Sequence, residues 1–141
     1  MESMSVFSKI ISYVKTTKDP IKAARDMGVK VGNNTRFISM PNFSSEPYLV
    51  SIGDHVTIAS QVSFLPHDGG TWCFRNEEGY ENVLSFAPIK IGNNCFVGYR
   101  STILKGVTIG NNVVVGACSL VTKNIPDNQV WGGTRSFYMH I

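Results

Sequence analysis

Several features that mark other classes of protein are missing from this chain. Only 16% of its 141 residues are charged, the formal net charge is +3, and no cluster of Lys and Arg marks a face for nucleic acid. No apolar run reaches the length of a membrane span, and the N-terminus lacks the apolar core of a signal peptide. We therefore expect no nucleic-acid partner and no stable insertion into a membrane.

Cysteine is also scarce. The chain has three, Cys73, Cys95 and Cys118, an odd count without paired spacing. Such a set favours reduced thiols and a cytoplasmic location. The length and a hydrophobic content of 43% predict one globular domain.

The chain is rich in a repeat of six residues. An aliphatic side chain recurs at every sixth position, namely Ile91, Val97, Ile103, Ile109, Val115 and Val121. A small or β-branched residue follows four places after each of the first five, at Cys95, Ser101, Val107, Val113 and Ser119. A helix needs apolar spacing of three and four, and an amphipathic strand needs two. A period of six instead predicts short strands joined by tight corners and stacked as a solenoid, with three hexads in each turn.

Residues 1–27 differ from the rest and are predicted to form an N-terminal helical cap over the open end of the solenoid. A first stretch has apolar residues at helical spacing, namely Val6, Phe7, Ile10, Ile11 and Val14. A second short helix is expected around Asp19 to Met27, with Pro20 in its first turn. The alternative for this region is a surface that recognises a membrane-bound acceptor or its enzyme.

Residues 28–141 are predicted to form the β-helix domain. The first repeat signal is Val31-Gly-Asn-Asn, and the phase returns at Ile52 after an irregular stretch. The phase breaks again because Phe64 and Ile91 are 27 residues apart, which is not a multiple of six. Residues 67–87 should therefore leave the solenoid as a long loop. A loop of this length without structure of its own is often functional.

The repeats over about residues 28–134 resemble those of the hexapeptide-repeat acyltransferases, in particular the maltose and galactoside O-acetyltransferase branch. The resemblance implies an all-β solenoid, a left-handed parallel β-helix with a short N-terminal helical region and one long extruded loop. It also implies a homotrimer that moves an acetyl group from acetyl-CoA, a co-substrate, to a hydroxyl of a sugar or polysaccharide precursor. The His-Asp-Gly-Gly-Thr-Trp loop is similar to that of members linked to surface polysaccharides. An amine or a serine remains an alternative acceptor.

His67 is the candidate general base, because it follows the last inward residue of a coil at the start of the loop. An imidazole suits proton transfer from a hydroxyl near neutral pH. The alternative is a histidine bonded locally to loop amides. The resemblance favours catalysis, since the family's catalytic histidine lies in a loop between two repeat blocks. Glu81, Asp54 and a backbone carbonyl are candidates to orient the ring.

The resemblance also implies a cofactor site. Ala117 and Thr122 match positions that contact the pantetheine arm, and Lys123 matches a lysine that meets a CoA phosphate. Gly98 and Tyr99 match positions near the thiol end, where the family often has a small residue in place of the tyrosine. From the residues alone, Ala117 is equally a packing residue and Lys123 a solvated charge. The tail from Arg135 to Ile141 departs from the family pattern.

Two other interpretations stay open. A γ-type carbonic anhydrase shares the solenoid but needs three zinc-binding histidines. The chain has only His55, His67 and His140, and His140 lies outside the repeats, so no metal site is expected. A non-catalytic solenoid is the other alternative.

Overall fold

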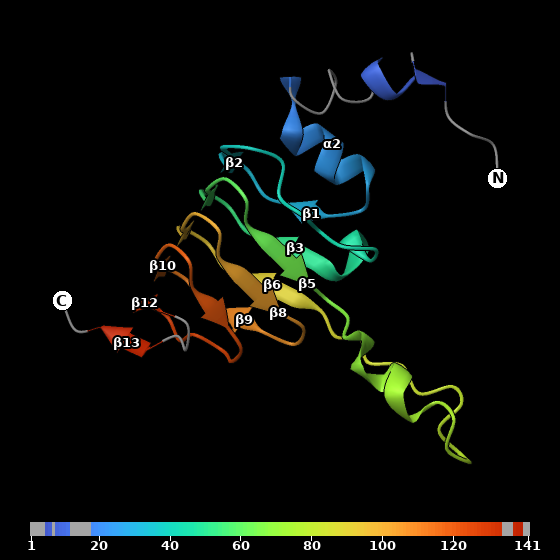
Figure 1. Cartoon of the computed structure of the whole chain (residues 1–141). Coiled ribbons are helices and arrows are strands. Elements are labelled where there is room, and N and C mark those ends of the chain that lie inside the picture. The colour runs from blue at the N-terminus through green and yellow to red at the C-terminus, as the bar shows by residue number, and fades with distance from the viewer. Residues whose placement is uncertain (1–4, 7, 12–17, 134–136, 140–141) are drawn as a thin grey trace.

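The computed structural model describes residues 5, 6, 8–11, 18–133 and 137–139. Most of these residues wind into a left-handed parallel β-helix of three narrow sheets, as predicted (Figure 1). Sheet A contains β1 (Lys30–Val31), β3 (Val50–Ile52), β6 (Ile89–Ile91) and β9 (Thr108–Ile109). Sheet B contains β2 (Arg36–Phe37), β4 (Thr57–Ile58), β7 (Phe96–Val97), β10 (Val114–Val115), β12 (Val130–Gly132) and β13 (Phe137–Met139). Sheet C contains β5 (Ser63–Leu65), β8 (Thr102–Leu104) and β11 (Leu120–Val121).

The core of the solenoid is the inward row that the hexads predict. Both repeating sets are at most 5% exposed, which confirms the phase: Ile91, Val97, Ile103, Ile109, Val115, Val121, Cys95, Ser101, Val107, Val113 and Ser119. In the first coils, aromatic rings take three inward positions, at Phe37, Phe43 and Phe64, beside aliphatic ones such as Ile52 and Ile58. Phe43 stacks on Phe64 with ring centroids 5.3 Å apart. Burial of this continuous row, rather than any single coil, is what stabilises the stack.

The corner between sheets A and B explains the Gly-Asn-Asn sequences. The last residue of each corner is left-handed, with φ between 53° and 62° at Asn34, His55, Asn94, Asn112 and Asn128. Asparagine tolerates this conformation better than most residues, and here its amides also stack, since Asn94 Nδ2 donates to Asn112 Oδ1 at 2.8 Å. A Cβ on Gly92 would lie 2.6 Å from the carbonyl oxygen of Gly110 in the next coil, so the coils approach too closely for any side chain there.

The short helix α2 (Pro20–Asp26) lies against the first coil. The Asp19 side chain caps it by accepting from Lys22 N at 2.9 Å. Ala24 is fully buried, and the Arg25 guanidinium donates to the carbonyl oxygens of Val31 and Gly32, at the outer edge of sheet A. Of the predicted first helix, residues 6 and 8–11 are helical. Phe7 and Val14 lie outside the described residues.

At the other end of the solenoid, β13 runs antiparallel to β12, with Trp131 opposite Tyr138. The chain thus turns back on the last coil instead of continuing the parallel winding. Thr134, Arg135, His140 and Ile141 lie outside the described residues, so the atypical tail is described only in this one strand. Within the described ranges, no helix is long and apolar enough to span a bilayer.

The long loop leaves sheet C after β5 and returns at β6, and it extends away from the solenoid (Figure 1). The expectation that it lacks structure of its own is wrong, because the 3-10 helix η2 occupies Gly69–Phe74. The Asp68 carboxylate starts this helix by accepting from Gly70 N at 2.8 Å. The loop was predicted from the break in the six-residue repeat. Such a break gives no information about a local side-chain cap, so the short helix was missed.

Candidate active site

His67 lies where the chain passes from the solenoid into the loop. In β5, Phe64 points into the core while Ser63 and Leu65 point outward. Two residues later, His67 forms an antiparallel bridge with Phe86 on the returning strand of the loop. This bridge fixes the backbone of His67. Its side chain is 34% exposed, so the ring remains accessible to solvent.

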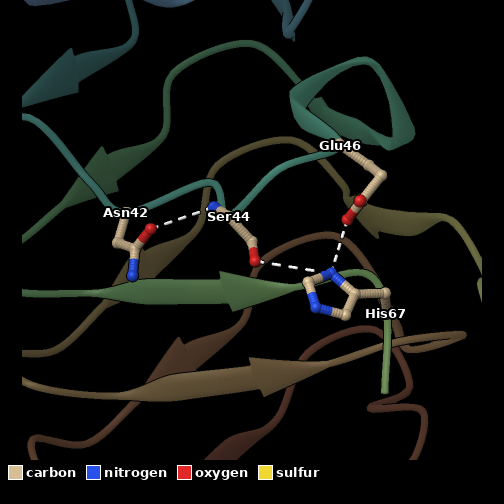
Figure 2. Close-up of polar contacts among 4 residues, drawn as sticks. All are labelled: Asn42, Ser44, Glu46 and His67. Atoms are coloured by element: carbon tan, nitrogen blue, oxygen red, sulfur yellow. Dashed lines mark hydrogen bonds and ion pairs between the residues drawn. The ribbon is translucent and has the colours of Figure 1, made fainter. Parts of the chain in front are cut away.

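The imidazole of His67 is held by Glu46. The His67 Nδ1 and Glu46 Oε2 atoms are 2.5 Å apart, and the Glu46 side chain is only 13% exposed (Figure 2). Ser44 Oγ lies 3.5 Å from the same nitrogen. Because a carboxylate can only accept, Nδ1 carries the hydrogen and donates it, which leaves Nε2 as the acceptor for an incoming proton.

The segment that carries Glu46 is fixed on β5. Asn42 forms a parallel bridge with Ser63, and its side-chain oxygen accepts from Ser44 N at 2.9 Å (Figure 2). Ser44 has a positive φ of 60°, and this turn directs the chain toward His67. The 3-10 helix η1 (Pro47–Leu49) begins directly after Glu46 and leads into β3. The irregular stretch of the sequence is therefore what supplies the partner of His67.

The residues that the sequence suggested for orienting His67 do not do so. Glu81 accepts from Gly79 N at 3.1 Å within the loop. Asp54 accepts from Asn33 N at 2.6 Å at the corner of sheets A and B. A signal for Glu46 does exist in the sequence. The first two coils repeat at 21 residues, from Val31 to Ile52, and position 46 precedes position 67 by the same number.

A cavity of about 400 Å³ opens beside His67. Its walls come from the start of the loop and from the end of β8 in the next coil, namely Leu65, His67, Asp68, Gly69, Leu104 and Lys105. Lys105 Nζ is 3.4 Å from Asp68 Oδ2. The Gly70 amide and then the Lys105 ammonium hold the pKa of Asp68 below its usual value. The cavity thus combines two leucines with charged hydrogen-bonding groups, the mixture found in small-molecule sites.

Three of the predicted cofactor residues share the corner between sheets B and C. Cys118 N donates to Tyr99 O at 2.7 Å, so the Tyr99 and Ala117 turns stack on one another. Gly98 is required at this contact, since a Cβ there would lie 2.5 Å from Ala117 N. Ala117 is exposed and Tyr99 is 44% exposed, so both line the surface of the corner.

Thr122 and Lys123 lie at the opposite end of β11, past Val121. Both are exposed. The Lys123 ammonium is 5.5 Å from the centroid of the Trp131 ring, a cation–π contact that the sequence did not indicate. This contact holds the cation near the end of the solenoid.

Within the described part of one chain, the candidate residues do not form one site. His67 follows the C-terminal end of sheet C, whereas Tyr99 and Ala117 precede its N-terminal end. A strand of three residues spans about 10 Å, so these groups lie on the order of 10 Å apart or more.

Histidine placement also bears on the zinc alternative. His55 occupies the corner of sheets A and B, away from His67 at the end of sheet C. Among the residues that the structure describes, no group of three or more His, Cys, Asp or Glu side chains is arranged to hold a metal ion. His140 lies outside the described residues.

The sequence is similar to a known repeat family and to two known proteins. The family model described as the hexapeptide repeat of succinyl-transferase matches residues 88–123. Protein CapG of Staphylococcus aureus is 58% identical over 111 residues, which cover 77% of this chain and 63% of the relative. Galactoside O-acetyltransferase of Escherichia coli (strain K12) is 47% identical over 90 residues, covering 62% of this chain and 42% of that protein.

Among solved structures, a maltose O-acetyltransferase from Clostridium difficile 630 superposes with a TM-score of 0.67 at 33% identity. This match covers 79% of the chain and 58% of the other protein. The chain therefore spans less than two thirds of each of these relatives. Its repeats, its parallel sheets and these similarities agree, and the chain belongs to the hexapeptide-repeat acyltransferase family.

Proposed function

We propose that this protein transfers an acetyl group from acetyl-CoA to a hydroxyl of a sugar or polysaccharide precursor, with His67 as general base. The observation that carries the proposal is the pair of His67 and Glu46 beside a cavity with polar and apolar walls. The relatives named for galactoside and maltose O-acetylation support an acetyl transfer to a sugar. The free thiols of Cys73, Cys95 and Cys118 fit a reducing compartment such as the cytoplasm.

The proposed mechanism is a direct transfer. Nε2 of His67 takes the proton of the acceptor hydroxyl while the oxygen attacks the thioester carbonyl carbon. The new C–O bond forms a tetrahedral intermediate, which backbone amides stabilise. The C–S bond then breaks, and the proton on His67 passes to the leaving sulfur to give CoA and the acetyl ester. Glu46 stabilises the imidazolium between these two proton transfers.

The donor site in this proposal comes from two chains. His67 and the Tyr99–Ala117 corner are too far apart in one chain to act on the same thioester, so a neighbouring solenoid supplies the missing wall. We propose a homotrimer, in which every interface has one His67 and one such corner. Light scattering should give about 46.5 kDa, three times the chain mass of 15.5 kDa. A mass of one chain at micromolar concentration would contradict this assembly.

Subunit mixing tests the shared site directly. His67→Ala and Ala117→Trp, each with little activity alone, should recover part of it when the two chains are co-expressed. Recovery requires a site that takes its two halves from different chains. No recovery in verified mixed trimers would place both halves in one chain.

The experiment for the function is a thiol-release assay with acetyl-CoA over a panel of sugars, with an amine and serine as comparison acceptors. Mass spectrometry then locates the acetyl group. We expect release that depends on a sugar and a product ester on a hydroxyl. Preference for the amine or serine would overturn the acceptor assignment, and no release with any acceptor would favour the non-catalytic solenoid.

A further inference from the structure

We propose that Lys105 is a positioning residue, which holds His67 in place through its ion pair with Asp68 at the exit of the loop. The ion pair connects the coil that contains β8 to the residue that directly follows His67. The catalytic part of this inference rests on the proposed function, whereas the structural part is tested without activity.

The geometry places Lys105 at the point where the loop departs. Leu104, the last residue of β8, pairs in register with Leu65, the last residue of β5. Lys105 therefore lies under the chain that continues from Leu65 to His67. Its ammonium is 3.4 Å from Asp68 Oδ2, and its side chain is only 27% exposed against 60% for the aspartate. The lysine is thus the more buried partner of the pair, and it comes from the solenoid.

Asp68 connects this anchor to the fold of the loop. One carboxylate oxygen meets Lys105, and the other accepts from Gly70 N at 2.8 Å, where η2 begins. The lowered pKa of Asp68, to which the Gly70 amide contributes most and Lys105 next, agrees with both contacts. Because Asp68 is covalently adjacent to His67, a carboxylate fixed on both sides also restrains the imidazole.

Few other contacts hold the loop to the solenoid. None of residues 68–88, all of which the structure describes, is buried, so the loop adds nothing to the hydrophobic core. The two ends are joined by Asp68 N donating to Ser85 O and Ala87 N donating to Pro66 O, both at 2.9 Å, and Gly106 N of the solenoid donates to Pro88 O at 3.1 Å. A segment with so few buried contacts opens easily, and a single polar contact at its base then has a measurable effect.

The loop carries one trypsin site, after Arg75, since no other Lys or Arg occurs between residues 68 and 88. Lys105→Met removes the ammonium and keeps an unbranched side chain. Asp68→Asn removes the charge but keeps an oxygen for Gly70 N. Lys90→Met, which removes an exposed lysine of sheet A, is the matched control.

At low salt, we expect trypsin to cleave the native protein after Arg75 about two- to fivefold faster in Lys105→Met and in Asp68→Asn than in the wild type. This factor corresponds to the free energy that an exposed ion pair contributes. The difference should disappear at about 1 M salt, where such a pair is screened. The double variant should be cleaved no faster than either single one, because both changes remove the same contact. Unchanged cleavage in Lys105→Met, or equal acceleration in Lys90→Met, would overturn the proposal.

Kinetics test the catalytic part. The turnover number of Lys105→Met should fall about two- to fivefold, with little change in the Michaelis constant of the acceptor, and Lys105→Arg should restore it. Faster cleavage with unchanged turnover would show that the pair does not position His67. A raised acceptor constant with unchanged cleavage would make Lys105 an acceptor contact instead. If the wild type transfers nothing, the cleavage result still decides whether the ion pair holds the loop.

Discussion

Glu46→Gln tests the arrangement that sets the chemistry of His67. The substitution replaces a carboxylate by an amide of the same shape and so keeps the packing beside η1. In the wild type, His67 Nδ1 and Glu46 Oε2 are 2.5 Å apart and Glu46 is 13% exposed, so water screens the contact little. When Nε2 takes the acceptor proton, the ring becomes a cation, and the carboxylate stabilises that cation directly.

The size of the effect follows from this contact. A hydrogen bond to a charged partner contributes about 1.5–3 kcal/mol. Losing it in the transition state lowers the turnover number about ten- to hundredfold. The Michaelis constant for acetyl-CoA should change little, since Glu46 contacts Nδ1 and not the nitrogen that exchanges protons with the substrates.

The assay is steady-state thiol release, with Glu81→Gln as the matched control. Glu81 lies in the long loop that begins at His67, but its side chain contacts Gly79, not His67. Thermal melts should show that both variants remain folded. Wild-type turnover in Glu46→Gln, or an equal loss in Glu81→Gln, would refute the assignment of Glu46.

Three further predictions concern other parts of the chain. Lys123→Ala should raise the Michaelis constant for acetyl-CoA about ten- to hundredfold and leave that of the acceptor nearly unchanged; an unaltered constant would mean that Lys123 does not meet a CoA phosphate. Gly92→Ala should lower the free energy of unfolding in urea by about 1–3 kcal/mol, because its Cβ would meet the backbone of the next coil. Gly69→Ala, where the described residues leave open space, is the control, and equal midpoints would contradict the stacking argument. Burial raises the pKa of Cys95, so alkylation near neutral pH should spare it while exposed Cys73 reacts, and mass spectrometry of the native protein should find Cys95 labelled only after unfolding.

The hexads were sufficient to predict the solenoid because each one specifies which side chain enters the core. Ile103 and Val115 are fully buried, as their phase requires. The corners could be predicted from Gly-Asn-Asn. Few other sequences allow a left-handed residue at the end of the corner together with so close a contact between coils at the glycine. This part of the fold depends on local spacing, so one sequence reveals it.

The partners of His67 were harder to predict because they depend on contacts between coils. Glu46 lies in the stretch that has no hexad phase, and its position opposite His67 follows only when the 21-residue spacing of the first two coils is applied there. Lys105 reaches Asp68 from a coil that the long loop separates in sequence by 37 residues. Neither the Glu46–His67 pair nor the Lys105–Asp68 pair is marked by a local sequence pattern. An insertion between coils leaves the inward row intact but changes which side chains lie next to one another at the corners.

The most direct measurement of the central claim is the turnover number of His67→Ala with acetyl-CoA and the best acceptor from the panel. A positioned general base contributes about 10²–10⁴-fold to rate, so the turnover should fall within that range. The oligomeric state and the binding of acetyl-CoA should persist, and His55→Ala at the far corner should keep its activity. Full transferase activity in His67→Ala would contradict the account.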